Sequence, residues 1–232
     1  MIQNINRRAK LIIINLSSGY SLLIHLKLTG QLIFQDNNKK KSVNKPDKYT
    51  RLVYNFSDSS QLFHNDLRKF GYVKVVPTKE LENFLKKEEN YGPEPLSKNF
   101  TLKLFKKLLS LRPNSKIKPL LMNQSVIAGI GNLYSDEILF ESGVRPDRLV
   151  KDLKTNEVKK IFQNIKKILK KAIQCKGSSV NNYLDVKGQK GGYNNFIKVY
   201  RREGKLCYKC GTEIIQKRIN GRSAHFCPHC QK

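Results

Sequence analysis

The C-terminal segment "CYKCGTEIIQKRINGRSAHFCPHC" limits the fold of this chain more than any other feature, because it groups four of the five cysteines into two pairs. Two residues lie between the cysteines of each pair, and sixteen residues separate the pairs. Such short turns let two thiolates converge on one metal ion, and the intervening segment is long enough for a β-hairpin. We therefore predict one structural zinc ion, with a redox pair, or His225 or His229 replacing one cysteine, as the alternative. The predicted ligands are Cys207, Cys210, Cys227 and Cys230.

The residues before this module change their apolar period once along the chain. Up to about residue 77, short apolar runs separated by turn residues predict antiparallel strands. These runs are "KLIIINL", "YSLLIHLKL", "QLIFQ", "TRLVYNF", "QLFHN" and "YVKVV". From about residue 97 to residue 177, apolar residues recur at helical spacing. The sequence thus indicates an α+β chain with a β-sheet domain, a helical domain and the zinc hairpin.

Three helices are placed by the residues at their ends. A helix near residues 115–123 has Pro119 in its opening turn and is followed by the turn "AGIGN". Behind that turn, Asn132 is expected to be the N-cap of a second helix, and Thr155 is expected to cap a long amphipathic third helix. Free backbone amides at a helix N-terminus attract anions, so "AGIGN" is a candidate phosphate site, with tight packing of its glycines as the alternative.

The charge balance points to a polyanionic partner. The 232 residues include 45 Lys and Arg against 18 Asp and Glu, a formal net charge of +27. A basic surface binds nucleic acid by releasing the counterions of its phosphates, and an anionic membrane surface is the alternative. No apolar run reaches the length of about 18 residues that a membrane span needs, and the N-terminus lacks the apolar core of a signal peptide. We expect a cytoplasmic protein that binds nucleic acid.

Basic residues also stand beside apolar ones at several turns. The segments "HLKLTG" and "NDLRKFG" have this composition and lie on or after predicted strands. A protein that wedges an apolar side chain into a base stack and holds the phosphates needs the same combination. Arg222 in "NGR" is expected at the tip of the zinc hairpin, where it can reach a phosphate. Ordinary strand-end residues and a solvated turn arginine are the alternatives.

Eight motifs occur in the order seen in one known family. They are "RRAK", "HLKLTG", "DLRKFG", "YGPEPLS", "IKPLLMNQSVIAGIGNLYSDEILF", "KGGY", "VYRREG" and the four-cysteine finger ending in "CPHCQK". From Arg7 to Lys232 the chain thereby resembles the formamidopyrimidine-DNA glycosylase family, bacterial repair enzymes that excise oxidised purines and nick the DNA. The related endonuclease VIII, which removes oxidised pyrimidines, shares the architecture and is the alternative.

The resemblance implies three regions and a bound substrate. They are an N-terminal β-sandwich over residues 1–90 that is incomplete at its start, a helical domain with a helix-two-turns-helix motif over residues 91–195, and a zinc finger over residues 196–232. DNA is expected in the cleft between domains. The implied partner is double-stranded DNA with an oxidised purine or an abasic site, bound by a monomer that carries one zinc ion.

The resemblance also implies catalytic and phosphate-binding roles. Lys10 matches a lysine that contacts the phosphate and assists the chemistry beside the lesion. Arg222 matches the finger arginine that binds phosphate at the catalytic centre, and Asn132 matches the phosphate-binding residue of the helix-two-turns-helix motif.

A second set of matched residues concerns the flipped base. Leu28, Arg68 and Phe70 match the trio that fills the gap which a flipped base leaves in the stack. Lys190 lies in the loop that closes over that base, and His25 in "HLKLTG" is assigned to the same DNA surface.

The sequence departs from the family at its start. The family's nucleophile is an N-terminal proline followed by glutamate, whereas here Met1 is followed by Ile2, and the first proline is Pro46. We therefore expect no efficient covalent adduct between these 232 residues and abasic DNA. A misplaced start codon or a degraded gene would explain the missing Pro-Glu pair. The alternative function is a non-catalytic protein of the same fold that binds damaged DNA. In a further alternative Lys10 supplies the amine, which requires its pKa to fall from about 10.4.

Overall fold

The computed structural model of the protein describes residues 1–36, 46–180 and 183–232. It divides into two compact units. The first comprises Met1–Phe84 and Ala172–Asn195, and the second comprises Leu85–Lys171 and Phe196–Lys232. Each unit is therefore built from two separate segments of the chain.

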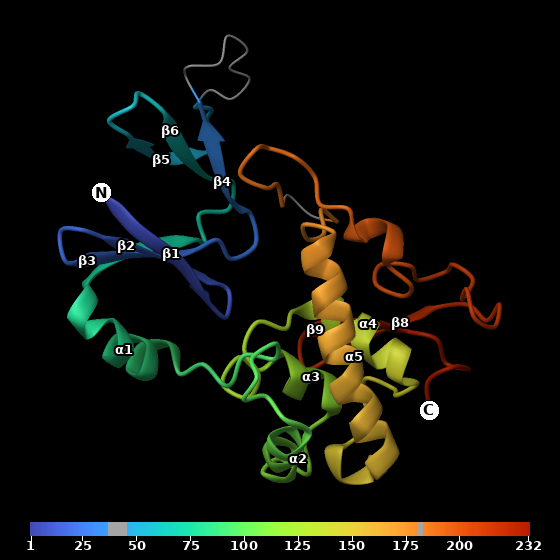
Figure 1. Cartoon of the computed structure of the whole chain (residues 1–232). Helices are drawn as coiled ribbons and strands as arrows, with labels where there is room; N and C mark the ends of the chain where they lie inside the picture. Colours follow the sequence, from blue (N-terminus) through green and yellow to red (C-terminus); the bar gives the residue numbers. More distant parts are fainter. Residues whose placement is uncertain (37–45, 181–182) are drawn as a thin grey trace. The chain divides into compact units, whose positions relative to one another are not determined.

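The first unit contains two antiparallel sheets (Figure 1). One sheet has the order β1-β2-β3-β7, with β1 (Ile2–Arg8), β2 (Leu11–Leu16), β3 (Tyr20–His25) and β7 (Tyr72–Pro77). The other has the order β4-β6-β5, with β4 (Gly30–Gln35), β5 (Thr50–Asn55) and β6 (Gln61–Asp66). The six predicted strands are confirmed. β1 is a seventh strand that no apolar run predicts, because it lies at a sheet edge and its residues are almost all exposed.

The two sheets share one apolar core, as the α+β prediction requires. Ile14 and Ile24 of the first sheet are buried together with Leu32 of the second. Strand side chains alternate between faces, so β2 and β3 each present every second residue to the opposite sheet. Partly buried neighbours complete this core: Ile12, Leu16, Leu22, Leu26, Leu62 and Val73.

The longer helices belong mainly to the second unit. A short helix, α1 (Leu81–Phe84), ends the first segment of the first unit and continues into a π-helical turn at Leu85–Glu89. The helices that follow are α2 (Leu102–Ser110), α3 (Ile117–Met122), α4 (Asn132–Ser142) and α5 (Thr155–Gln174), with 3-10 turns at Thr78–Glu80, Val150–Asp152 and Tyr193–Phe196. Phe100, Phe105 and Phe162 stack at centroid distances of 5.5–6.0 Å and join α2 to α5. The helix predicted near residues 115–123 is confirmed as α3.

Two predicted helix caps are wrong by one position. Asn132 is the first residue of α4, and Gly131 is its N-cap, whose carbonyl accepts the Ser135 N–H at 3.0 Å. Likewise, α5 begins at Thr155, and the Lys154 carbonyl accepts its first helical hydrogen bond at 3.1 Å. The carboxylate of Glu157 binds the Lys154 N–H at 2.7 Å and replaces a threonine cap. The predicted C-cap of α4 is confirmed, because Gly143 has a φ of 71°.

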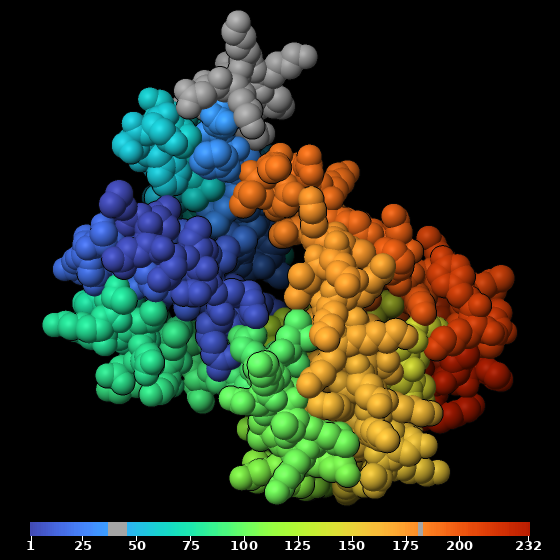
Figure 2. Space-filling view, viewed as in Figure 1, coloured from blue at the N-terminus to red at the C-terminus, as the bar shows by residue number. Residues whose placement is uncertain are grey.

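The zinc hairpin consists of β8 (Ile215–Ile219) and β9 (Arg222–Phe226). Asn220 and Gly221 join them with φ values of 45° and 77°, as a type I′ turn requires. The base of the hairpin shares a buried cluster with α4, formed by Phe140, Val199, Cys207, Ile214 and Cys227. The lysine-rich face of α5 lies at the surface of the molecule, yellow to orange in Figure 2. Among the described residues, no helix is long and apolar enough to cross a membrane.

Candidate functional site

The four predicted cysteines converge at the end of the hairpin. Their Sγ atoms all lie within 4.8 Å of one another. Cys207 Sγ is 3.9 Å from Cys230 Sγ, and Cys210 Sγ is 3.5 Å from Cys227 Sγ. Sulfur atoms around a tetrahedral zinc ion with bonds of about 2.3 Å lie about 3.8 Å apart, whereas a disulfide bond is about 2 Å long. The donor set therefore fits one structural zinc ion and leaves no position open for a catalytic water.

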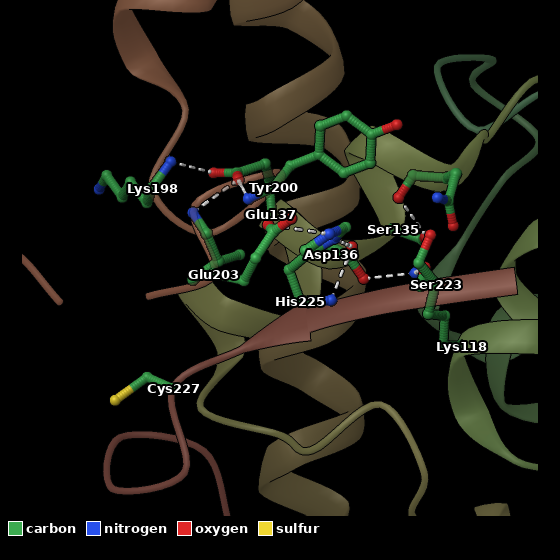
Figure 3. Close-up of polar contacts among 12 residues, drawn as sticks. Lys118, Ser135, Asp136, Glu137, Lys198, Tyr200, Glu203, Ser223, His225 and Cys227 are labelled. Atoms are coloured by element: carbon green, nitrogen blue, oxygen red, sulfur yellow. Dashed lines mark hydrogen bonds and ion pairs between the residues drawn. The ribbon is translucent and has the colours of Figure 1, made fainter. Parts of the chain in front are cut away.

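A buried carboxylate on α4 fixes the position of β9 (Figure 3). Asp136 is 1% exposed, and its Oδ1 accepts a hydrogen bond from Lys118 Nζ of α3 at 2.6 Å. Its Oδ2 accepts the His225 N–H at 3.0 Å and lies 3.0 Å from His225 Nδ1. Lys118 Nζ also donates to the Ser223 carbonyl at 2.6 Å. Burial lowers the pKa of Lys118, and the charge of Asp136 opposes that shift.

The neighbouring acid, Glu137, fixes a second segment. Its carboxylate accepts the N–H groups of Lys198, Val199 and Tyr200 at 2.9–3.0 Å. Burial raises the pKa of Glu137, although the three N–H donors oppose that shift. The adjacent acids of α4 thus hold both the zinc hairpin and the segment that leads into it, as Figure 3 shows.

Arg222 stands at the start of β9, directly after the hairpin turn. It lines a cavity of about 210 Å³ between α3 and the hairpin. The other lining residues are Lys118, Pro119, Met122, Asn123, Ile219 and Asn220. Lys118 and Asp136 hold the backbone of β9 in place next to Arg222. The Arg222 side chain therefore extends from an anchored strand, which favours a defined contact between its guanidinium group and an anion.

Asn132 occupies the first turn of α4 behind the glycine-containing turn. Gln124 shapes that turn: its Oε1 accepts the Gly129 N–H at 2.8 Å, and its Nε2 donates to the Ile130 carbonyl at 2.9 Å. Gly129 has a φ of 88°, which a residue with a Cβ rarely adopts. Asn132 Oδ1 is buried and has no hydrogen-bond partner among the described residues. A phosphodiester has no donor for this oxygen, so a phosphate at this helix N-terminus would be bound by N–H donors, either the Asn132 side-chain NH₂ group or free backbone amides.

In the first unit, predicted site residues gather at one end of the four-stranded sheet. Lys10 lies in the turn between β1 and β2, next to the register pair Leu11 and His25. His25 in turn pairs with Tyr72, and their rings are 5.5 Å apart. The segment that carries Leu28 begins at this end, after His25, and the segment that carries Arg68 and Phe70 ends there, before Tyr72.

These apolar side chains are exposed. Leu28 is 52% exposed and Phe70 is 54% exposed. The guanidinium carbon of Arg68 lies 4.6 Å from the centroid of the Phe70 ring, a cation-π distance. Exposed apolar groups beside a positive charge match what insertion into a base stack requires.

Lys190 belongs to a loop that follows α5 and returns to the first unit. Asp185 organises this loop, because its carboxylate accepts the N–H groups of Lys187 and Gln189 at 2.9 and 2.8 Å. The Phe34 N–H of β4 donates to the Val186 carbonyl at 2.8 Å and ties the loop to the sheet. Lys190 itself is exposed.

The predicted site residues therefore fall into two groups, one in each unit. The sequence prediction missed the residues that hold them in place, of which Asp66, Lys118, Asp136 and Glu137 are nearly fully buried. One signal for these residues was available. Asp136 and Glu137 are charged residues in the middle of α4, whose central residues are all buried, and buried charged side chains need partners.

Three family models match most of the chain. The "Formamidopyrimidine-DNA glycosylase N-terminal domain" matches residues 1–73, and the "Formamidopyrimidine-DNA glycosylase H2TH domain" matches residues 91–183. The "Zinc finger found in FPG and IleRS" matches residues 204–232. The three matches follow one another along the chain without overlap.

Curated relatives and solved structures match over the whole chain. A formamidopyrimidine-DNA glycosylase of Pelotomaculum thermopropionicum is 40% identical over 100% of this chain and 81% of its own length. One of Listeria monocytogenes is 38% identical over 100% of this chain and 82% of its own length. The Lactococcus lactis protein bound to DNA with an abasic site has a TM-score of 0.90 at 33% identity, covering 100% of this chain and 82% of that one.

Proposed function

Because the chain belongs to the formamidopyrimidine-DNA glycosylase family, we propose that it acts in base-excision repair as a DNA glycosylase and abasic-site lyase on oxidised purines. The observation that carries the proposal is the full-length match, at TM-scores of 0.90, to structures that hold DNA with an abasic site or a Fapy-dG lesion. The substrate class is then duplex DNA with formamidopyrimidines or 8-oxoguanine. Since DNA is its substrate, we place the protein in the cytoplasm.

In this proposal one group of residues binds phosphates and a second group enters the base stack. Asn132 and Arg222 of the second unit bind phosphates, because one lies at a helix N-terminus and the other on an anchored strand. Leu28, Arg68 and Phe70 of the first unit enter the stack where the damaged base has left it.

Three further residues act around the flipped nucleotide. Lys10 contacts the phosphate beside the lesion and assists the chemistry, and Lys190 belongs to the loop that covers the extruded base. His25 supports the DNA-facing end of the sheet through its ring contact with Tyr72. The zinc ion keeps the hairpin folded, and the four cysteines hold it.

Base release tests the proposed reaction. The protein is incubated with a duplex that contains one 8-oxoguanine opposite cytosine, and the freed base is measured by chromatography. Release from this duplex, and none from an undamaged duplex of the same sequence, is the result that the proposed reaction requires. Tight binding to the damaged duplex with no release of base would contradict excision and leave recognition alone.

Borohydride trapping identifies the amine that attacks the sugar. The reaction needs an unprotonated amine to form an imine, and borohydride converts that imine into a stable covalent adduct. Lys10 is the amine that this proposal places beside the lesion, so it is the residue to test. Loss of the adduct in Lys10→Ala, but not in the matched Lys27→Ala, would assign Lys10. An adduct of equal yield in both variants would exclude it.

A further inference from the structure

Two short crossovers join the sheets of the first unit at neighbouring positions (Figure 1). Residues 26–29 lead from β3 to β4, and residues 67–71 lead from β6 to β7. β3 pairs with β7 through His25 and Tyr72, and β4 pairs with β6 through Gly30 and Asp66. Each crossover therefore begins next to the end of the other. One of them carries Leu28, and the other carries Arg68 and Phe70.

A single carboxylate binds both crossovers. Asp66 is 2% exposed, and its Oδ1 accepts a short hydrogen bond from the Thr29 hydroxyl of the first crossover. Oδ1 also accepts the Arg68 N–H at 3.2 Å, and Oδ2 accepts the Gly71 N–H at 2.7 Å. The Arg68 N–H lies 3.1 Å from Thr29 Oγ1 as well, which closes the link between the two segments.

The crossovers need such a link because their conformations are unfavourable in isolation. Lys27 and Lys69 have φ values of 48° and 57°, in the left-handed region that residues with a Cβ avoid. The side chains of Leu28 and Phe70 are more than half exposed, so burial does not hold them in place. Hydrogen bonds to a buried charge supply a directional restraint that apolar contact does not supply here.

We infer that Asp66 is a positioning residue that places Leu28, Arg68 and Phe70 together as one wedge for the base stack. This inference rests on the proposed function, because it assumes that the three side chains enter the DNA. Asp66 itself is buried and does not contact DNA in this role. Its effect passes through Thr29 to one crossover and through the Arg68 and Gly71 amides to the other.

The charge of Asp66 is part of this role. Burial raises its pKa, but the Thr29 hydroxyl and the N–H groups of Gly71, Arg68 and Lys69 outweigh burial and hold the pKa below the ordinary value. An ionised carboxylate offers only acceptors to these donors. Asparagine has the same shape but turns an NH₂ group toward one of them, so Asp66→Asn breaks one side of the link with little change in volume.

Two DNA measurements test the inference on the full chain. Duplexes with and without a tetrahydrofuran abasic site are compared, and 2-aminopurine beside the orphaned base reports unstacking by its fluorescence. We expect Asp66→Asn to weaken binding to the abasic duplex about tenfold, or about 1.4 kcal/mol, because charged hydrogen bonds of this size are lost. Binding to the undamaged duplex should change less than about twofold, since phosphate contacts dominate it. The rise in 2-aminopurine fluorescence at saturating protein should also become smaller.

Matched variants separate positioning from general damage to the fold. Asp58→Asn removes a carboxylate that accepts hydrogen bonds from Ser60 in an exposed turn of the same unit, and it should behave as wild type. Thr29→Val should show a milder form of the Asp66→Asn effect, and Thr29→Ser should restore wild-type behaviour. In a Phe70→Ala background, Asp66→Asn should add little, because the side chain that it positions is already absent.

The outcomes are distinguishable from failure of the proposed function. If the wild type does not prefer the abasic duplex, the proposed function fails. If the wild type prefers it and both Asp66→Asn and Thr29→Val keep that preference and the full fluorescence change, the inference is wrong. Equal weakening on both duplexes, or full additivity with Phe70→Ala, would assign Asp66 a general structural role and also overturn the inference.

Discussion

Replacement of Asp136 by alanine should destabilise the second unit strongly. The substitution leaves Lys118, which is 1% exposed, without its ion-pair partner and removes the acceptor of the His225 N–H. Breaking a buried ion pair by removing one partner costs about 3–5 kcal/mol. At about 2–4 °C per kcal/mol for a chain of this size, the melting temperature should fall by about 6–20 °C.

Loss of a proton from Lys118 sets an upper limit on this cost. Removing a proton from a lysine of ordinary pKa 10.5 at pH 7 costs about 5 kcal/mol, at about 1.36 kcal/mol per pH unit. In Asp136→Ala the folded state then holds a neutral Lys118 and the unfolded state a charged one. Because the unfolded state binds more protons, stability rises with pH. The loss relative to wild type should therefore shrink between pH 7 and pH 9.

Urea unfolding of the zinc-loaded protein at pH 7, 8 and 9 measures both effects. Asp152→Ala is the matched control, since this carboxylate is exposed in the same unit and should cost less than about 0.5 kcal/mol. The double variant Lys118→Met with Asp136→Leu removes both charges, so its loss should be smaller and independent of pH. A loss below about 1 kcal/mol in Asp136→Ala, or one that stays constant from pH 7 to pH 9, would refute this reasoning.

Three other predictions follow from the same contacts. Removal of zinc by a chelator should abolish amide-exchange protection in β9 while the first unit keeps its unfolding transition. Hydrogen exchange measured by mass spectrometry checks this, and protection kept in β9 would contradict it. Arg222→Ala should weaken binding to damaged and undamaged duplexes equally and lower the salt slope by about 1, whereas an unchanged slope in a salt titration argues against a phosphate contact. Glu157→Gln should cost up to about 1 kcal/mol at pH 7 in urea unfolding. Burial raises the pKa of Glu157, but the hydrogen bonds and charges of Arg148 and Lys154 together outweigh burial and lower it. This cost should therefore vanish as pH falls through the lowered pKa, and a cost that persists in acid would contradict the prediction.

The sequence predicted the parts of the fold that depend on local spacing. Apolar runs with β-branched residues mark six of the seven strands described in the first unit, and the cysteine pairs mark the zinc site, because both signals lie within short stretches of chain. β1 escaped prediction because an edge strand with exposed residues needs no apolar pattern. The caps at Asn132 and Thr155 were placed one residue late, because Gly131 and Lys154 supply backbone carbonyls rather than capping side chains.

The supporting contacts of the site could not be predicted from spacing. Asp136 and His225 are 89 residues apart in the chain, and Thr29 and Asp66 are 37 residues apart. Their contacts depend on how α4 packs on β9 and on which strands pair across the sheets. The two adjacent acidic residues of α4, Asp136 and Glu137, indicate that partners exist, but only the tertiary fold identifies those partners.

Binding to an abasic duplex tests the proposed recognition of damaged DNA most directly. The dissociation constant for a duplex with one tetrahydrofuran site is compared with that for the undamaged duplex at the same salt concentration. Since an abasic site already lacks the base that must leave the stack, Leu28, Arg68 and Phe70 can enter at lower cost. We predict tighter binding to the abasic duplex by about tenfold or more, and loss of most of that ratio in Phe70→Ala. Equal affinity for the two duplexes would contradict the proposal.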